Sequence, residues 1–318
     1  MTASVVICAY TDERWDDITA AIQSVLAQTP PPAEVLLVVD HCDMLLARAR
    51  QAFAEVRVLA NTGAKGLSSA RNVGFQAASS DVVAFLDDDA QAAPGWLALL
   101  LDGYRDNNVV GVGGSVRPHW VTGRPRWFPA EFDWVVGCSH SGMPDRRADV
   151  RNFVGANMSM RRSSLVQLRG FSDHLGRRGA GVAGCEETEL CIRAGALTST
   201  SRLVYEPSAL VIHNVPAHRA TLSYFLRRCY GEGKSKAMVR HLAGSATALS
   251  SERAYLSTTI PVGIGRALKG TTRGDPCEIW RACALLVGVG ATFAGYLFGR
   301  TGDPAVRSRA FNENGGRK

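Results

Sequence analysis

The sequence predicts an α/β fold in which helices flank a mostly parallel β-sheet, followed by a helical C-terminal extension. Across the first half of the 318-residue chain, short runs that are apolar at every position alternate with amphipathic stretches, and the connections between them are short. Such runs are typical of strands buried on both faces of a parallel sheet. From residue 220 onward, helical spacing and long uncharged stretches replace the alternation.

Taken in order, the first half predicts four strands and three helices. The strands are expected at residues 4–9, 35–39, 56–59 and 82–86. The helices are expected at 16–28, at 45–53 and from the loop 61–68 to residue 77. Three prolines after Thr29 end the first helix.

The second half is less regular. It predicts a helix at 97–104, a strand at 109–112, an apolar segment at 153–162, a helix from Cys185 and two short strands at 204–207 and 209–213. Residues 115–151 are rich in proline and tryptophan, which indicates either a binding loop or ordinary surface packing. The Gly- and Arg-rich loop 176–184 is expected to be mobile.

Composition limits the class of protein. With 46% hydrophobic and 20% charged residues, the chain is not globally disordered. Its net charge of +7 suits nucleic acid, anionic lipid or phosphorylated substrates equally well. The eight cysteines form no CxxC pair and no zinc-like cluster, and the N-terminus lacks the features of a signal peptide. These features predict a reducing, cytosolic environment for the catalytic part.

Three adjacent carboxylates, Asp87, Asp88 and Asp89, follow the strand predicted at 82–86. They would repel one another unless positive charge lies among them. The carboxyl ends of strands are also where open α/β sheets bind ligands, and Tyr10 and Asp40 follow two other strands. Mg²⁺ and Mn²⁺ prefer oxygen ligands and commonly bridge to phosphates. The pattern therefore indicates a metal–diphosphate site, with an acidic turn as the alternative.

Other candidate residues each have a structural alternative. Arg71, one turn into a helix, suits either a phosphate contact or a surface salt bridge. Glu186 and Glu187 begin a predicted helix, where acids complement the helix dipole or where one of them acts as a general base. His213 ends a strand, as a structural residue or as a metal ligand. No dinucleotide or P-loop fingerprint is present.

The C-terminal third predicts contact with lipid or with phosphate. A helical apolar pattern between residues 220 and 240 is typical of a membrane-surface helix, a phosphate clamp or a solvated face covering the core. The basic residues around it are Arg227, Arg228, Lys234, Lys236 and Arg240. The uncharged segment 282–298 suits a membrane span, an in-plane or re-entrant segment, or a buried helix. The polar tail 301–318 is expected to be disordered.

Four segments, in their order and spacing, resemble family 2 glycosyltransferases: residues 5–10, 34–40, 66–74 and 85–89. The resemblance covers residues 3–215 and implies a GT-A type nucleotide-binding sheet and an inverting transfer of a sugar from a nucleotide-sugar donor. We therefore expect a catalytic domain at 1–215, a basic, apolar helical region at 216–300 and a disordered tail at 301–318.

The resemblance also implies where the donor binds. Ala9, Tyr10 and Asp40 would line the nucleobase pocket, with Arg71 near the nucleotide. Asp87 to Asp89 match the DxD motif: Asp87 would approach the ribose or the donor sugar, Asp88 would lie among the nucleotide-sugar contacts, and Asp89 would hold the divalent metal, Mn²⁺ or Mg²⁺. The base is expected to be uracil.

The remaining implied roles concern the metal, the acceptor and the base. His213 would complete the metal site with Asp87 and Asp89, while Gly155 and Asn157 would line the donor-sugar and acceptor pocket. Glu186 and Glu187 stand where the family has a Glu-Asp pair, so Glu187 would be the base. Because the usual Asp is replaced by Glu, which of the two glutamates acts stays open.

The expected partners are a nucleotide-sugar donor, a glycan or lipid-linked acceptor of cell-envelope or polysaccharide synthesis, and the cytoplasmic face of a membrane, without nucleic acid. Two other functions compete. A sugar-phosphate nucleotidyltransferase would need an N-terminal Gly-rich signature with a lysine, which residues 4–14 lack. A non-catalytic membrane-bound partner with a degenerate nucleotide-sugar pocket would not need Asp87, Asp89 and Glu187 intact.

Overall fold

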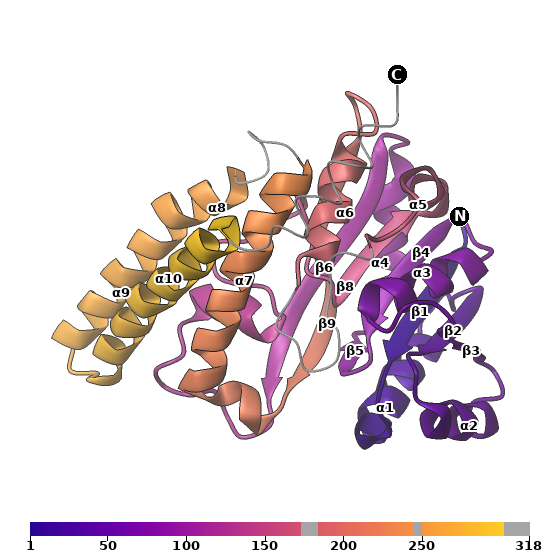
Figure 1. Ribbon diagram of the computed structural model, residues 1–318, viewed down its shortest axis with the longest axis horizontal. Helices are drawn as coiled ribbons and strands as arrows, with labels where there is room; N and C mark the ends of the chain where they lie inside the picture. The colour runs from indigo at the N-terminus through magenta and orange to yellow at the C-terminus, as the bar shows by residue number, and fades with distance from the viewer. Residues whose placement is uncertain (173–183, 244–249, 302–318) are drawn as a thin grey trace.

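The computed structural model describes residues 1–172, 184–243 and 250–301. The predictions of a mobile loop at 176–184 and a disordered tail at 301–318 fall almost entirely outside these ranges. Figure 1 shows a central sheet with helices on both faces and a group of C-terminal helices packed beside it.

The first half of the chain forms the parallel part of the sheet, as predicted. Strands β1 (Ala3–Ala9), β2 (Glu34–Val39), β3 (Arg57–Ala60) and β4 (Val82–Asp87) pair in parallel in the order β3-β2-β1-β4. Every residue of β2 after Glu34 is buried, which is why its sequence is apolar throughout.

The second half makes the sheet mixed. Strand β8 (Asn157–Arg161) runs antiparallel to β4 and to β6 (Val109–Trp120), and β6 pairs in parallel with β9 (Arg202–Val215). Short strands β5 (Ala90–Ala92) and β7 (Ala148–Asp149) add to β9. Two predictions are corrected here: β6 continues eight residues past the expected end at 112, and the two short strands expected at 204–213 are one.

Helices cover both faces of this sheet. On one face lie α1 (Trp15–Leu26), α2 (Asp43–Ala52) and α4 (Trp96–Asp102), which pack on the inward side chains of alternate strand positions such as Val5 and Ile7. On the other lie α3 (Leu67–Ala77), α5 (Arg162–Leu168) and α6 (Glu186–Gly195), packed around residues such as Val6 and Phe85. The alternation is what a strand buried on both faces requires.

The C-terminal helices form a separate packed group. It consists of α7 (Leu222–Ala243), α8 (Ser250–Ala254), α9 (Ile260–Thr272) and α10 (Cys277–Thr301). An aromatic core joins α7 to the segment η3 (Ala130–Val136), because the ring of Phe225 contacts the rings of both Phe128 and Phe132. Part of the aromatic segment predicted as a loop or as packing therefore packs under these helices.

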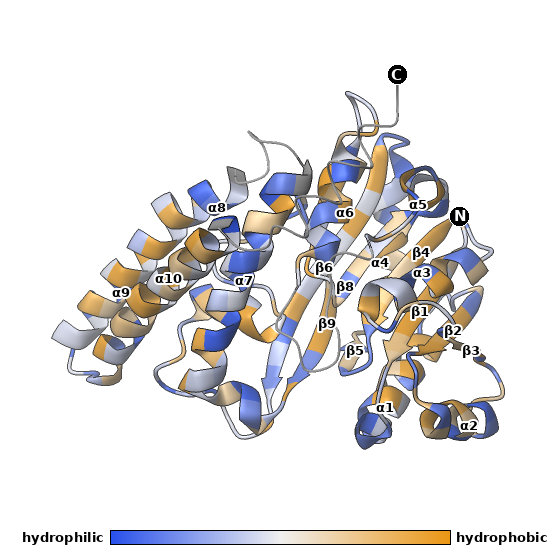
Figure 2. Cartoon of the chain, viewed as in Figure 1, coloured by the Kyte–Doolittle hydropathy of each residue, from blue (hydrophilic) through white to orange (hydrophobic). Residues whose placement is uncertain are grey.

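Helix α10 has two contrasting faces. One packs closely on α7, because a Cβ added at Gly295 would lie 2.0 Å from the carbonyl oxygen of Tyr230, and one at Gly233 would lie 2.0 Å from that of Thr292. The other face is exposed and apolar, and Figure 2 shows apolar segments, in orange, along α9 and α10. Its exposed residues are Ile279, Trp280, Leu286, Val287, Phe293, Leu297 and Phe298. Within the described residues, Cys277–Arg300 alone is long and apolar enough to cross a membrane.

Candidate active site

The acidic cluster lies where β4 ends. Antiparallel pairing of β5 with β9 sets His213 opposite Ala90, so the histidine reaches back to the carboxylate that precedes that strand. His213 Nε2 lies 3.1 Å from Asp89 Oδ1, and one ligand atom each of Asp87, Asp89 and His213 fall within 4.8 Å of one another. The sequence prediction grouped these three residues, and the fold brings them together.

This set of donor atoms fits a divalent cation. Carboxylate oxygens and a neutral imidazole nitrogen are ligands that Mn²⁺ accepts, and both Asp89 and His213 are buried, so the atoms are held in place. The three residues could therefore hold Mn²⁺ or Mg²⁺.

Two arginines balance the charge of the cluster. Arg14 Nη1 lies 3.0 Å from Asp88 Oδ1 and 3.2 Å from Asp89 Oδ2, and Arg219 Nη2 lies 3.4 Å from the same Asp89 oxygen. Burial raises the pKa of Asp88 to about 7, together with the neighbouring charge of Asp89. Burial also disfavours a charged Asp89, but His213 and the two arginines outweigh it and hold its pKa below the usual range.

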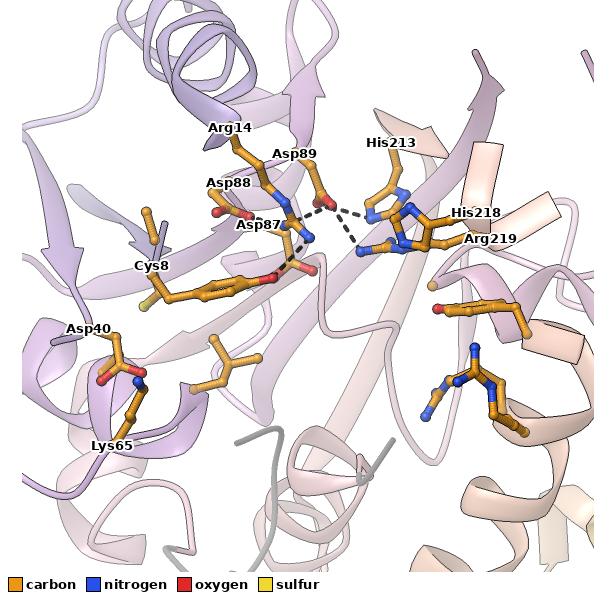
Figure 3. Close-up of a pocket in the computed structure, with 18 residues that line it drawn as sticks. Cys8, Arg14, Asp40, Lys65, Asp87, Asp88, Asp89, His213, His218 and Arg219 are labelled. Atoms are coloured by element: carbon orange, nitrogen blue, oxygen red, sulfur yellow. Dashed lines mark hydrogen bonds and ion pairs between the residues drawn. The ribbon is translucent and has the colours of Figure 1, made fainter. Parts of the chain in front are cut away.

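Asp40, which also lines the pocket, is held by two hydrogen bonds. Its Oδ1 accepts a hydrogen bond of 2.6 Å from Asn61 Nδ2, and its Oδ2 accepts one of 3.0 Å from the backbone N–H of Gly66. Tyr10 is exposed, and Arg14 Nη2 donates a 3.3 Å hydrogen bond to its hydroxyl. Tyr10 and Asp40 both line the same pocket, and Lys65 lies beside Asp40 (Figure 3).

Arg71 connects the acidic cluster to helix α6. Its Nη2 lies 3.1 Å from Asp87 Oδ1 and donates a 3.0 Å hydrogen bond to the carbonyl of Gly155, while its Nη1 lies 3.1 Å from Glu186 Oε1. The guanidinium is buried, so the alternative of a surface salt bridge is wrong for Arg71. It fixes the first turn of α6 relative to the end of β4.

Glu187 follows Glu186, but within residues 1–172, 184–243 and 250–301 it forms no ion pair. The hydroxyl of Thr188 donates a hydrogen bond of 3.4 Å to Glu187 Oε1. Burial raises the pKa of Glu187 to about 8, helped by the negative charges of Glu186 and Glu232. A carboxylate with a raised pKa is a stronger base at neutral pH than an ordinary glutamate, which suits proton abstraction.

Gly155 and Asn157 have different positions. A Cβ added at Gly155 would lie 3.2 Å from Arg71 Nη2 and 3.6 Å from Glu187 Cγ, so the glycine leaves room between these side chains. Asn157, in contrast, is fully buried in the sheet and hydrogen-bonds Trp96 Nε1 and the carbonyls of Ser115 and Ala209. Its expected place in the donor-sugar and acceptor pocket is corrected: Asn157 holds strands together.

A pocket of about 340 Å³ joins these parts (Figure 3). Ala9, Tyr10, Asp40, Asp87, Asp88, Asp89 and His213 line it, as predicted, whereas Arg71, Gly155, Asn157, Glu186 and Glu187 are not among its lining residues. The lining residues without an assigned role from the sequence are Cys8, Arg14, Lys65, Leu67, Ala70, Gly137, His218, Arg219, Tyr224, Arg227 and Arg228. The sequence feature that could have indicated His218 and Arg219 is their position a few residues after His213. Arg227 and Arg228 belong to the predicted helix for which a phosphate clamp was one of the alternatives.

Comparison with known proteins agrees with this geometry. The family model described as "Glycosyl transferase family 2" matches residues 4–169. A glucosyl-dolichyl phosphate glucuronosyltransferase of Haloferax volcanii is 33% identical over 305 residues, which are 94% of this chain and 96% of that protein. The succinoglycan biosynthesis protein ExoM of Rhizobium meliloti is 30% identical over 53% of this chain and 51% of its own.

Solved structures share the fold. The mannosyltransferase PcManGT from Pyrobaculum calidifontis, in complex with GDP-Man and Mn²⁺, superposes with a TM-score of 0.58 at 15% identity over 94% of this chain and 85% of its own. GalNAc-T7 with UDP, GalNAc and Mn²⁺ gives a TM-score of 0.52 at 16% identity over 80% of this chain and 53% of its own. Both likenesses concern the fold of the sheet and its helices.

Proposed function

This chain belongs to glycosyl transferase family 2, and from that premise we propose that it transfers a sugar from a nucleoside diphosphate donor, with inversion, to a hydroxyl of a lipid-linked or glycan acceptor. The observation that carries the proposal is the pocket in which Asp40 and the group Asp87, Asp89 and His213 lie together. Arg71 ties that group to the helix bearing Glu187.

The chain's own residues account for donor binding. Tyr10 and Asp40 offer an aromatic face and hydrogen-bond acceptors to a nucleobase, which we expect to be uracil. Asp87, Asp89 and His213 would hold the divalent cation, which, when bound, would neutralise charge on the diphosphate as a Lewis acid. Arg14 and Arg219, already beside Asp89, add positive charge where the departing diphosphate gains negative charge.

Glu187 is the proposed base. It accepts the proton of the attacking acceptor hydroxyl while that oxygen bonds to the anomeric carbon, and the bond from that carbon to the diphosphate oxygen breaks with its electron pair leaving on the nucleotide. Attack from the face opposite the leaving group inverts the anomeric carbon. Glu186 forms an ion pair with Arg71, with 3.1 Å between Oε1 and Nη1, and this favours Glu187 over Glu186 as the base.

A lipid-linked acceptor is supported by two observations. The relative from Haloferax volcanii, which this chain matches over nearly its whole length, is named for a glucosyl-dolichyl phosphate acceptor. The exposed apolar face of α10 continues onto α9 through Val262 and Leu268. We propose that this face lies in the surface layer of a membrane rather than spanning it, because the opposite face of α10 is packed on α7.

We propose that the protein lies on the cytoplasmic side of the membrane, because its cysteines are not paired in disulfides. All eight are free thiols, and several are buried in the core, as expected for a protein kept in a reducing compartment.

Calorimetric titration of the purified chain with UDP, GDP and dTDP, each with and without Mn²⁺, tests the proposal. We expect one diphosphate, UDP, to bind in a manner that needs Mn²⁺ and that is lost in Asp89→Ala. The matched control is Asp81→Ala, which removes an exposed carboxylate at the opposite end of β4. Absence of nucleotide binding under every condition would contradict the proposal and favour the non-catalytic partner.

A further inference from the structure

The wall of the pocket opposite Asp40 is basic. It is formed by the segment η4 (Ala217–Ala220) and the first turns of α7, and Figure 3 shows its side chains across the pocket from Asp40 and Lys65. The lining residues it contributes are His218, Arg219, Tyr224, Arg227 and Arg228. No carboxylate from η4 or α7 is among the residues that line the pocket.

Most arginines near the acidic cluster already have carboxylate partners within it. Arg14 pairs with Asp88 and Asp89, and Arg219 pairs with Asp89. Arg227 differs: it is exposed to the pocket and forms no ion pair with any carboxylate in residues 1–172, 184–243 and 250–301. The positive charge at this wall therefore exceeds what the donor site needs for its own carboxylates.

Arg228 is held in place from behind. Its Nη2 lies 3.6 Å from Glu232 Oε2, and Lys236 Nζ bridges Glu232 at 3.2 Å to Glu252 at 2.6 Å. Glu252 in turn receives two hydrogen bonds from Arg151, at 2.6 and 2.7 Å. This chain of alternating charges is mostly buried, so the wall is a preformed part of the fold.

The electrostatic field at the wall favours an anion. Burial lowers the pKa of His218, and the positive charges of Arg219, Arg14 and Arg227 lower it further. A group that resists protonation because cations surround it lies where a negatively charged ligand gains energy. Arginine guanidinium groups bind phosphate oxygens with directed, charge-assisted hydrogen bonds.

Helix α7 also connects this wall to the lipid-facing surface. Behind the turn that carries Arg227 and Arg228, Tyr230 and Gly233 contact α10, whose outer face is exposed and apolar. An amphiphile that lay on this surface could place its headgroup at the basic wall and its chain along α9 and α10.

We propose that Arg227 and Arg228 form a phosphate subsite, separate from the donor diphosphate site, for the phosphate that links the acceptor sugar to its lipid. The inference rests on the proposed glycosyltransferase function and assigns the acceptor class to a lipid phosphosugar. Arg227 supplies an exposed hydrogen-bond donor, and Arg228 supplies a charge held by the buried network.

Equilibrium binding by the full chain in detergent, with UDP and Mn²⁺ present, tests the subsite with three probes. Farnesyl phosphoglucose carries both lipid and phosphate, farnesyl glucoside lacks the phosphate, and glucose 1-phosphate lacks the lipid. We expect farnesyl phosphoglucose to bind roughly tenfold or more tightly than either of the others. Arg227→Gln removes the advantage over the glucoside, whereas Lys234→Gln, an exposed residue of the same helix outside the pocket, retains it.

Other outcomes would overturn the inference in distinguishable ways. Equal binding of the phosphorylated and neutral lipids by the wild-type chain, or glucose 1-phosphate binding as tightly as the lipid phosphosugar, would exclude a lipid-phosphate subsite. Weaker UDP binding in Arg227→Gln with the phosphate preference intact would assign the wall to the donor diphosphate. If Arg227→Gln weakened the binding of UDP-glucuronate but not that of UDP-glucose, the basic wall would be assigned to the carboxylate of the donor sugar. In each of these cases, Mn²⁺-dependent UDP binding by the wild-type chain would still support the glycosyltransferase proposal. If the wild-type chain did not bind UDP, both the glycosyltransferase proposal and the phosphate subsite would be overturned.

Discussion

Arg71 and Glu186 form a buried ion pair, with 3.1 Å between Nη1 and Oε1, although the two residues are 115 positions apart in the sequence. The same guanidinium reaches Asp87 at 3.1 Å with its other terminal nitrogen. One side chain therefore sets the distance between the end of β4 and the start of α6, the two elements that carry the proposed cation ligands and the proposed base.

Replacement of Arg71 by methionine is expected to lower the free energy of unfolding by about 3–5 kcal/mol, because two carboxylates would lose the cation that compensates them in a buried setting. Urea unfolding followed by circular dichroism measures the loss. Arg105→Met is the control: Arg105 is exposed and pairs with Asp102, and its loss should cost less than about 1 kcal/mol. Equal effects in the two variants would argue against Arg71 as the brace of the site.

Glu187→Gln and Glu186→Gln should have different effects, the first mainly on turnover and the second mainly on stability. Loss of the base lowers turnover by about 10²–10⁴-fold while UDP affinity and unfolding stay near wild type. Loss of the charge on Glu186 weakens the pair with Arg71, so destabilisation should be its main effect. Turnover, UDP binding and urea unfolding of both variants give the comparison. A fully active Glu187→Gln variant would reverse the assignment.

The pH dependence of turnover should report Glu187. Its pKa is about 8, and the base acts when deprotonated, so kcat/KM should rise with pH below about 8 and level off above it. Glu232→Gln removes a negative charge that raises this pKa, so the rise should move to lower pH. Initial rates from pH 5.5 to 9.5 in wild type and Glu232→Gln measure the shift. An unmoved midpoint in Glu232→Gln would exclude this electrostatic contact.

Glycines on the two faces of α10 should respond oppositely to alanine. A methyl group at Gly295 meets the backbone of Tyr230 at 2.0 Å, so Gly295→Ala must force α10 from α7 and is expected to cost about 1–3 kcal/mol. A methyl group at Gly290 has no neighbouring atom within 4 Å, so Gly290→Ala should stabilise the helix by up to about 1 kcal/mol. Thermal unfolding in detergent compares the two. A stabilised Gly295→Ala variant would contradict the packing of α10 on α7.

The exposed face of α10 should determine vesicle binding. The double change Trp280→Ser and Phe293→Ser removes two large apolar side chains and should weaken partitioning into phosphatidylglycerol-containing vesicles by at least about tenfold. Val121→Ser and Met44→Ser remove exposed apolar side chains elsewhere and should leave it unchanged. Vesicle co-sedimentation measures the difference. Equal retention of both variants would exclude α10 as the membrane contact.

The parallel half of the fold was predictable because its signal is local. Strands β1, β2 and β4 are apolar at nearly every position, and β1 and β2 are each followed by a turn and an amphipathic helix. The prediction of a family 2 glycosyltransferase with a GT-A type sheet is confirmed. Four short motifs in the right order sufficed for it.

The long strands β6 and β9 were not predictable to their full length. Gly113 and Gly114 in β6 disfavour a strand by propensity, yet the structure needs them: a Cβ at Gly113 would lie 2.3 Å from Phe153, and one at Gly114 would lie 1.9 Å from the carbonyl of Ala209. Close packing with residues far along the chain decides these positions, and a sequence pattern does not contain that information.

The basic wall illustrates the same limit at the site. Asp40 follows β2, Asp87 ends β4 and His213 lies two residues before the end of β9, so topology alone predicts that they meet. Arg219 and Arg228 reach the pocket because the aromatic core around Phe225 and Phe132 seats α7 beside the sheet. Conversely, Asn157 lies in a segment that resembles the family's donor-sugar and acceptor pocket, but its side chain forms hydrogen bonds with Trp96, Ser115 and Ala209 instead.

The pocket takes five of its lining residues, His218 to Arg228, from beyond position 215, where the sequence suggested that one domain ends. A sugar-transfer unit separated there would lack one side of its own cavity. The C-terminal helices and the rest of the pocket are thus expected to be inherited together, in keeping with an alignment to the Haloferax volcanii relative that extends over 94% of the chain. If α10 contacts lipid as proposed, a relative that changes its lipid is expected to change the pocket as well, since α7 both contacts α10 and lines the pocket.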